Sequence, residues 1–202
     1  ELDLGADIIG FDITELLAAV EVKTPIFMYL LHRANQALHG KRGGIMIDEG
    51  FFVLDDPYFA KVLVEDNART NRKKNNFLII STQQPEDTAK TNISRALNNV
   101  ASFKVFYPNP VADESIYCKH LGLTQHELDI VKHLESQSRY FLLQFDRGTD
   151  VEIIRLNLKD MPDLLHVISG REQSVKLLDT ILANNPGYTP AEWLPIFLNE
   201  CK

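Results

Sequence analysis

Two short apolar runs, each ending in polar residues, constrain the fold of this chain more than any other feature. IMID (45–48) and FLIIST (77–82) are apolar on both faces, which is typical of central strands in a parallel sheet. Between them, Asp56 and Pro57 begin a helical pattern that is amphipathic early and basic late. A strand, a helix and a strand in this order indicate a crossover in a parallel sheet, so the sequence predicts the α/β class.

The remaining segments predict further helices and strands up to the C-terminus. Helical periodicity, capping pairs and breakers predict a further helical tail, and we expect an α/β core at 1–158 and a helical appendage packed on it at 159–202. The predicted strands lie at 7–12 and 102–107, and a predicted hairpin joins 139–145 to 150–158. The predicted helices lie at 13–20, from Thr24 and Pro25 to about Leu38, at 91–101, at 112–121 and at 124–134. Two tail helices are opened by the pairs Ser169/Glu172 and Thr189/Glu192.

Composition excludes several classes of function. The longest apolar runs are a few residues, far short of the roughly 20 that cross a bilayer. The first residues lack a signal peptide and an initiating Met, so we expect a piece of a longer protein. The formal net charge of -7 argues against nucleic-acid binding, although it does not exclude a local basic patch.

Cysteine and histidine spacing gives no metal framework. Cys118 and Cys201 stand far apart without a CxxC motif, which favours free thiols. His126 and His133 share a predicted helix face, but they lack i,i+4 spacing and a third ligand.

The acidic pair Asp48 and Glu49 follows the first apolar run directly. In nucleotide hydrolases, a carboxylate at the tip of a buried strand holds Mg²⁺, usually through water, and a neighbouring Glu can polarise the attacking water. Gln83 follows the next apolar run, where a neutral amide can hydrogen-bond that water or the terminal phosphate. The alternative for all three residues is a solvated strand end.

A basic run precedes the second strand and has two interpretations. Arg69, Arg72, Lys73 and Lys74 close the predicted helix, where cations are favourable because of the helix dipole. The same residues would also suit contact with a phosphate, either in the same subunit or in a neighbouring one.

Taken together, IMIDE, RKKN, STQQP and YPNP resemble the CagE/TrbE/VirB family of type IV secretion ATPases. GFDITELL, YPNPVADESIYCKHLGLTQHELDIVKHL, SRYFLLQF, HVISGREQSVKLLDTIL and AEWLPIF look like successive blocks of that family's C-terminal motor domain. The resemblance therefore covers nearly the whole chain, and it implies a partial RecA-like P-loop core that contains Walker B but not Walker A.

The resemblance also implies roles for individual residues. Asp48 would hold Mg²⁺, Glu49 would orient or activate water, Gln83 would be the sensor amide, and Arg72 and Lys73 would contact nucleotide phosphates. The intact protein would be a Mg²⁺-dependent ATPase that drives pilus assembly and substrate transfer, including conjugation. It would act as a homo-hexamer with inner-membrane and other ATPase components, on the cytoplasmic face of the bacterial inner membrane.

Two departures from the family pattern bear on these expectations. The chain has no GxxxxGK[ST] loop, so we expect it not to hydrolyse ATP by itself. Gly50 stands where the family tends to have a bulky side chain, which bears on the geometry of Glu49. Two other functions fit less well: a DNA-translocating motor of the coupling-protein or FtsK-like type, and a non-catalytic docking module.

Overall fold

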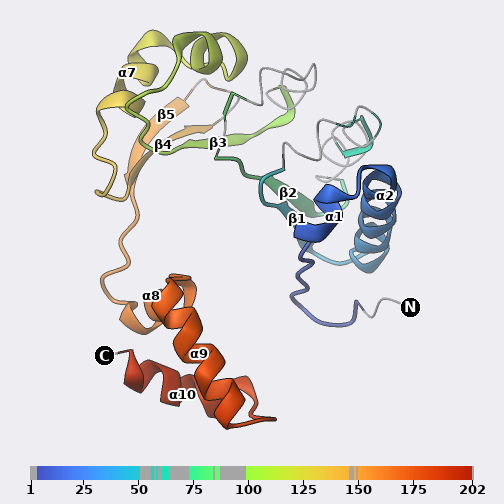
Figure 1. Cartoon of the computed structure of the whole chain (residues 1–202). Helices are drawn as coiled ribbons and strands as arrows, with labels where there is room; N and C mark the ends of the chain where they lie inside the picture. The colour runs from blue at the N-terminus through green and yellow to red at the C-terminus, as the bar shows by residue number, and fades with distance from the viewer. Residues whose placement is uncertain are drawn as a thin grey trace. The chain divides into compact units, whose positions relative to one another are not determined.

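The computed structural model describes residues 4–50, 56, 58, 61–63, 73–83, 85–86, 99–145, 148 and 150–201. The chain divides into two compact units, Glu1–Ile154 and Arg155–Lys202, whose elements Figure 1 labels along the chain. The elements are α1 (Thr14–Ala18), α2 (Val20–Ala37), β1 (Gly43–Ile47), β2 (Asn76–Ile80), β3 (Phe103–Phe106), the π-helix η2 (Ser115–His120), α7 (Gln125–His133), β4 (Tyr140–Phe145), β5 (Asp150–Arg155), α8 (Pro162–Ile168), α9 (Glu172–Asn184) and α10 (Pro190–Glu200).

β1 and β2 form a parallel pair, with Gly43 opposite Asn76 and Ile47 opposite Ile80. Parallel neighbours need a crossover connection, so this pairing confirms the strand order that the two apolar runs predict. The coarse prediction of an α/β fold is therefore correct.

Burial on β1 and β2 differs from the prediction of strands buried on both faces. Both strands alternate between half-buried and exposed residues. Ile45, Ile47, Leu78 and Ile80 pack against a core that contains Phe27 and Leu31 of α2 and Leu63, whereas Met46 on the other face is 70% exposed. The prediction was wrong because an apolar residue is buried only where another element covers it, and in the described residues one face of this pair is open.

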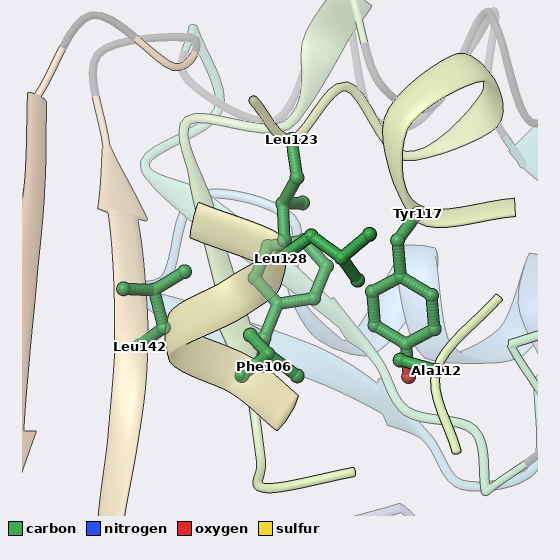
Figure 2. Packing of buried hydrophobic residues seen from close by; sticks show 7 residues of the cluster. Phe106, Ala112, Tyr117, Leu123, Leu128 and Leu142 are labelled. Carbon is green, nitrogen blue, oxygen red and sulfur yellow. The ribbon is translucent and has the colours of Figure 1, made fainter. Parts of the chain in front are cut away.

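The predicted strand at 102–107 is present as β3, but it belongs to a second sheet, in the order β3-β4-β5. β3 pairs antiparallel with β4. Helix α7 packs on this sheet, and Figure 2 shows Leu128 of α7 among the side chains of Phe106 and Tyr117. Leu128 and Leu142 are fully buried, and burying a leucine side chain contributes about 1.5–3 kcal/mol. This sheet and its helices therefore have their own core.

Helix α7 begins as the sequence predicts. The Thr124 hydroxyl accepts from the Glu127 N–H, and the Glu127 carboxylate accepts from the Thr124 N–H. This capping box satisfies two donors that a helix leaves free at its start.

The N-terminal predictions were partly wrong. No strand forms at 7–12 within the described residues, where Ile8 is 93% exposed. A strand requires a hydrogen-bonded neighbour, and instead Asp12 accepts from the N–H and the hydroxyl of Thr14 at the start of α1. The second helix starts at Val20 rather than at Thr24, and Pro25 lies inside it. Thr24 is not a cap because it lies inside α2, whose N-cap is Ala19; its hydroxyl donates to Asp56 instead.

The second unit consists of α8, α9 and α10. The predicted capping box at Thr189 and Glu192 opens α10. The box predicted at Ser169 and Glu172 is absent, because α9 has Arg171 at its N-cap and Ser169 ends α8. Phe197 is buried and its ring meets Trp193 edge-on at 6.3 Å between centroids, so the two aromatic residues pack within this unit.

Parts of the predicted helices at 57–74 and 91–101 lie outside the described residues. Among the residues that are described, no helix combines the length and apolar character that crossing a bilayer requires.

Candidate functional site

The turn after β1 and the residues after β2 lie side by side at one edge of the parallel pair. Ile47 is opposite Ile80 at the last step of the register. The backbone continues this pairing, because the Ser81 N–H donates to Ile47 O at 3.0 Å and the Gly50 N–H donates to Ser81 O at 3.0 Å. The polar residues that follow the two apolar runs therefore meet at the same edge of the parallel pair.

Asp48 is exposed and its carboxylate is held through one oxygen. Its Oδ1 accepts from the Glu49 N–H at 3.1 Å and from the Ser81 hydroxyl at 2.5 Å. Within the described part of the chain, Oδ2 accepts no hydrogen bond. Among the described residues, the hydrogen bonds to this exposed carboxylate thus go to one of its two oxygens.

Glu49 has an unusual backbone for a residue with a side chain, because its φ is 50°. A non-glycine residue in the left-handed region costs on the order of 1 kcal/mol or more, and such residues cluster at functional sites. The Glu49 Oε2 accepts a long hydrogen bond of 3.4 Å from the backbone N–H of Gln83. Both carboxylates therefore receive a donor from the residues that follow β2.

Gln83 contributes to this arrangement through its backbone. Its side chain is exposed and makes no hydrogen bond among the described residues. The structure brings the backbone of Gln83 beside Glu49, and a sensor role for its side-chain amide stays a prediction.

Gly50 has a steric explanation. It is buried, and a Cβ built on it would lie 2.5 Å from Cγ2 of Ile80 and 3.4 Å from Cγ2 of Ile47. The turn that carries Asp48 and Glu49 passes so close to β2 that a side chain would force it away. In this chain, glycine at this position keeps the acidic pair against the end of β2.

The basic residues lie at the other end of β2. Lys73 and Lys74 are exposed in the turn that precedes β2, and Arg72 lies outside the described residues. Five residues of strand extend about 17 Å at roughly 3.3 Å per residue, so the length of β2 separates Lys73 from the acidic pair. The structure brings together Asp48, Glu49 and Gln83 but does not bring Lys73 to them.

The acidic pair fits a magnesium ion that is held with the help of water and phosphate. Mg²⁺ prefers oxygen ligands, keeps several waters and is bound through one or two carboxylates plus substrate phosphates. The free Oδ2 of Asp48 suits this arrangement. No group of three or more His, Cys, Asp or Glu side chains in the described residues could hold a metal ion, so a cage built from protein ligands is not found there.

Sequence reasoning missed Ser81. The signal was available, because in a parallel pair the residue after Ile80 stands opposite the residue after Ile47. Aligning the ends of the two apolar runs would have placed a hydroxyl beside Asp48.

Comparison with known proteins gives consistent relatives. No family model matches the chain. It is 32% identical over 198 residues to the type IV secretion system protein VirB4 of Bartonella quintana. The matched residues make up 98% of this chain and 25% of that protein. It is 35% identical over 193 residues to VirB4 of Brucella suis, covering 96% and 23%, and 32% identical over 188 residues to PtlC of Bordetella pertussis, covering 93% and 22%. The chain thus spans about a quarter of the length of these curated relatives.

Proposed function

The chain is homologous over nearly its whole length to a segment of the VirB4 and PtlC proteins of type IV secretion systems, and from this premise we propose that it is part of an ATP-hydrolysing secretion motor. This homology confirms the resemblance to the type IV secretion ATPase family that the motifs indicate. The proposal includes the C-terminal part of a RecA-like core, for which the parallel β1–β2 pair with its acidic tip is the supporting observation.

The arrangement of Asp48 and Glu49 carries the proposal. A bound Mg²⁺ supplies positive charge that neutralises the phosphates of the nucleotide. Asp48 would hold the ion through its waters with Oδ2, which accepts no hydrogen bond from the described residues, and Glu49 would orient the attacking water. The backbone N–H of Gln83 donates to the Glu49 carboxylate, so Gln83 stands beside the acidic pair, and its side-chain amide would be the sensor of the terminal phosphate.

Arg72 and Lys73 act, in this proposal, on the phosphates of a nucleotide bound by another copy of the protein. What supports this direction is the position of Lys73 at the amino end of β2, a strand length away from the acidic pair. A cation supplied by a neighbouring subunit can raise the rate by about 10³ to 10⁵. The proposal therefore includes a homo-oligomer, for which we take the hexamer implied by the family resemblance.

In the cell, we place the motor at the cytoplasmic face of the inner membrane with other secretion components. The names of the relatives support the connection with a type IV secretion system. Pilus assembly and substrate transfer are the processes that ATP hydrolysis would drive.

Glu49→Gln in the complete gene product tests the function. We expect ATP turnover to fall by at least 10²-fold while ATP binding stays within a few-fold, because the change removes the base and keeps the shape. Glu135→Gln is the matched control, since Glu135 is exposed and lies just after α7. Turnover that persists in Glu49→Gln at the level of this control would contradict the proposal.

A further inference from the structure

We propose that Ser81 is a positioning residue for Asp48: its hydroxyl fixes the carboxylate so that Oδ2 is the oxygen presented to the waters of the bound magnesium ion. The observation is the hydrogen bond from Ser81 Oγ to Asp48 Oδ1 at 2.5 Å. The inference rests on the proposed function, because it assumes that Asp48 serves a magnesium ion.

Two donors on one oxygen limit the rotation of the carboxylate. The last torsion of an aspartate side chain is broad and roughly two-fold, so a free carboxylate exchanges its two oxygens. Here the Glu49 N–H and the Ser81 hydroxyl both donate to Oδ1. Any rotation short of a half-turn, which only exchanges two equivalent oxygens, would break both bonds, so the two donors hold the plane of the carboxylate; hydrogen bonds to a charged oxygen are stronger than neutral ones.

The backbone fixes where the Ser81 hydroxyl lies. The Ser81 N–H donates to Ile47 O and the Ser81 carbonyl accepts from the Gly50 N–H, each at 3.0 Å. Ser81 is therefore bonded to the residues on both sides of the acidic pair. Because these bonds use main-chain atoms, replacing the side chain removes the hydroxyl and leaves the pairing of β1 with β2 in place.

Both side chains are exposed, which leaves the site open to an ion and its waters. A serine that only closed the turn would stabilise the fold without changing affinity for a metal. Metal affinity, compared with fold stability, therefore separates a positioning role from a structural one.

The experiment measures Mn²⁺ binding to the complete gene product with ADP by electron paramagnetic resonance, with Mn²⁺ as the probe for Mg²⁺. Groups that orient a metal ligand typically contribute 10- to 100-fold to metal affinity. We expect Ser81→Ala to weaken Mn²⁺ binding by about tenfold, and Ser136→Ala, at an exposed serine remote in sequence, to leave it unchanged.

Ser81→Thr and Ser81→Val form a matched pair, because threonine and valine side chains have nearly the same shape and only threonine has a hydroxyl. We expect Ser81→Thr to retain wild-type affinity within about twofold and Ser81→Val to lose as much as Ser81→Ala. This pair keeps the test decisive if Ser81→Ala lowers the melting temperature. Equal affinities for the threonine and valine variants would overturn the positioning role.

Asp48→Asn distinguishes the two proposals. If Asp48→Asn binds Mn²⁺ as tightly as wild type, the proposed magnesium role of Asp48 is wrong. If Asp48→Asn loses affinity while Ser81→Val does not, the function stands and the positioning role fails. We also expect Ser81→Val to add nothing in the Asp48→Asn background, since the hydroxyl acts through that carboxylate.

Discussion

At the scale of single residues, the turn after β1 combines a strained glutamate with a glycine that has no space for a side chain. Glu49 adopts a φ of 50°, and Gly50 packs against Ile80. The family resemblance predicts a bulky residue after the glutamate, and this chain has glycine because β2 lies too close. The geometry of the acidic pair therefore depends on a residue that carries no chemistry of its own.

Gly50→Ala should destabilise the fold. The new Cβ would lie 2.5 Å from Cγ2 of Ile80, a branch fixed near the backbone, and relieving such overpacking costs about 1–3 kcal/mol. Urea unfolding of the chain measures this change. Gly10→Ala is the control, because nothing lies within 4 Å of its Cβ position. Equal stabilities for the two variants would show that the turn has room for a side chain.

At the scale of secondary-structure elements, local capping signals predict a helix start well only when the backbone can use them. The pairs at Thr124 and Thr189 form capping boxes. Ser169 has the same spacing to Glu172 but lies at the end of α8. Spacing identifies a candidate cap, and the preceding element decides whether the residue is available.

The α10 capping box predicts an altered titration of Glu192. Hydrogen bonds from the Thr189 backbone N–H, and then from its hydroxyl, hold the pKa of the Glu192 carboxyl below its ordinary value. Because the folded pKa is lowered, the stabilisation is present above the unfolded-state pKa and is lost as the pH falls through the folded-state pKa. We expect Thr189→Ala to raise the Glu192 pKa part of the way toward its ordinary value, because it removes the hydroxyl and keeps the backbone donor; NMR titration measures this change.

Thr180→Ala is the control for this titration. The Thr180 hydroxyl donates to Lys176 O within α9 and makes no described contact with Glu192. A Glu192 pKa that moves equally in both variants, or in neither, would argue against the capping box as the cause.

At the scale of the whole molecule, the part of the chain that the structure describes includes a parallel strand pair with an acidic tip. The sequence contains no GxxxxGK[ST] motif, and without its amides and lysine the β and γ phosphates lose their main contacts. The outer face of β1 and β2 is also open in the described residues, as the exposure of Met46 and Phe77 shows.

The 202-residue chain should therefore show no micromolar affinity for ATP, whereas the complete gene product should bind it. Isothermal titration of both proteins with Mg²⁺-ATP measures the difference, and circular dichroism verifies that the chain is folded. Micromolar binding by the folded chain would show that these residues hold the nucleotide without that loop.

Much of the site was predictable because it follows from periodicity. Two apolar runs with a helical segment between them require parallel strands, and parallel strands end at one edge, which brings Asp48, Glu49 and Gln83 together. The same argument places Lys73 at the opposite end, because it precedes β2 in the chain and so lies a strand length from the acidic pair. Ser81 was missed because the ends of the two apolar runs were not aligned, which would have placed its hydroxyl beside Asp48.

The sequence by itself determined the α/β class, the pairing order of β1 and β2, the start of α7 and α10, and the family, because these depend on local pattern and on residue identity. Tertiary structure alone decided the rest. It left one face of β1 and β2 open, kept the segment at 7–12 out of any sheet, placed Ile80 against Gly50 and aimed the Ser81 hydroxyl at Asp48. The physical reason is that burial, strand pairing and steric room each depend on a second segment of chain, which no local pattern specifies.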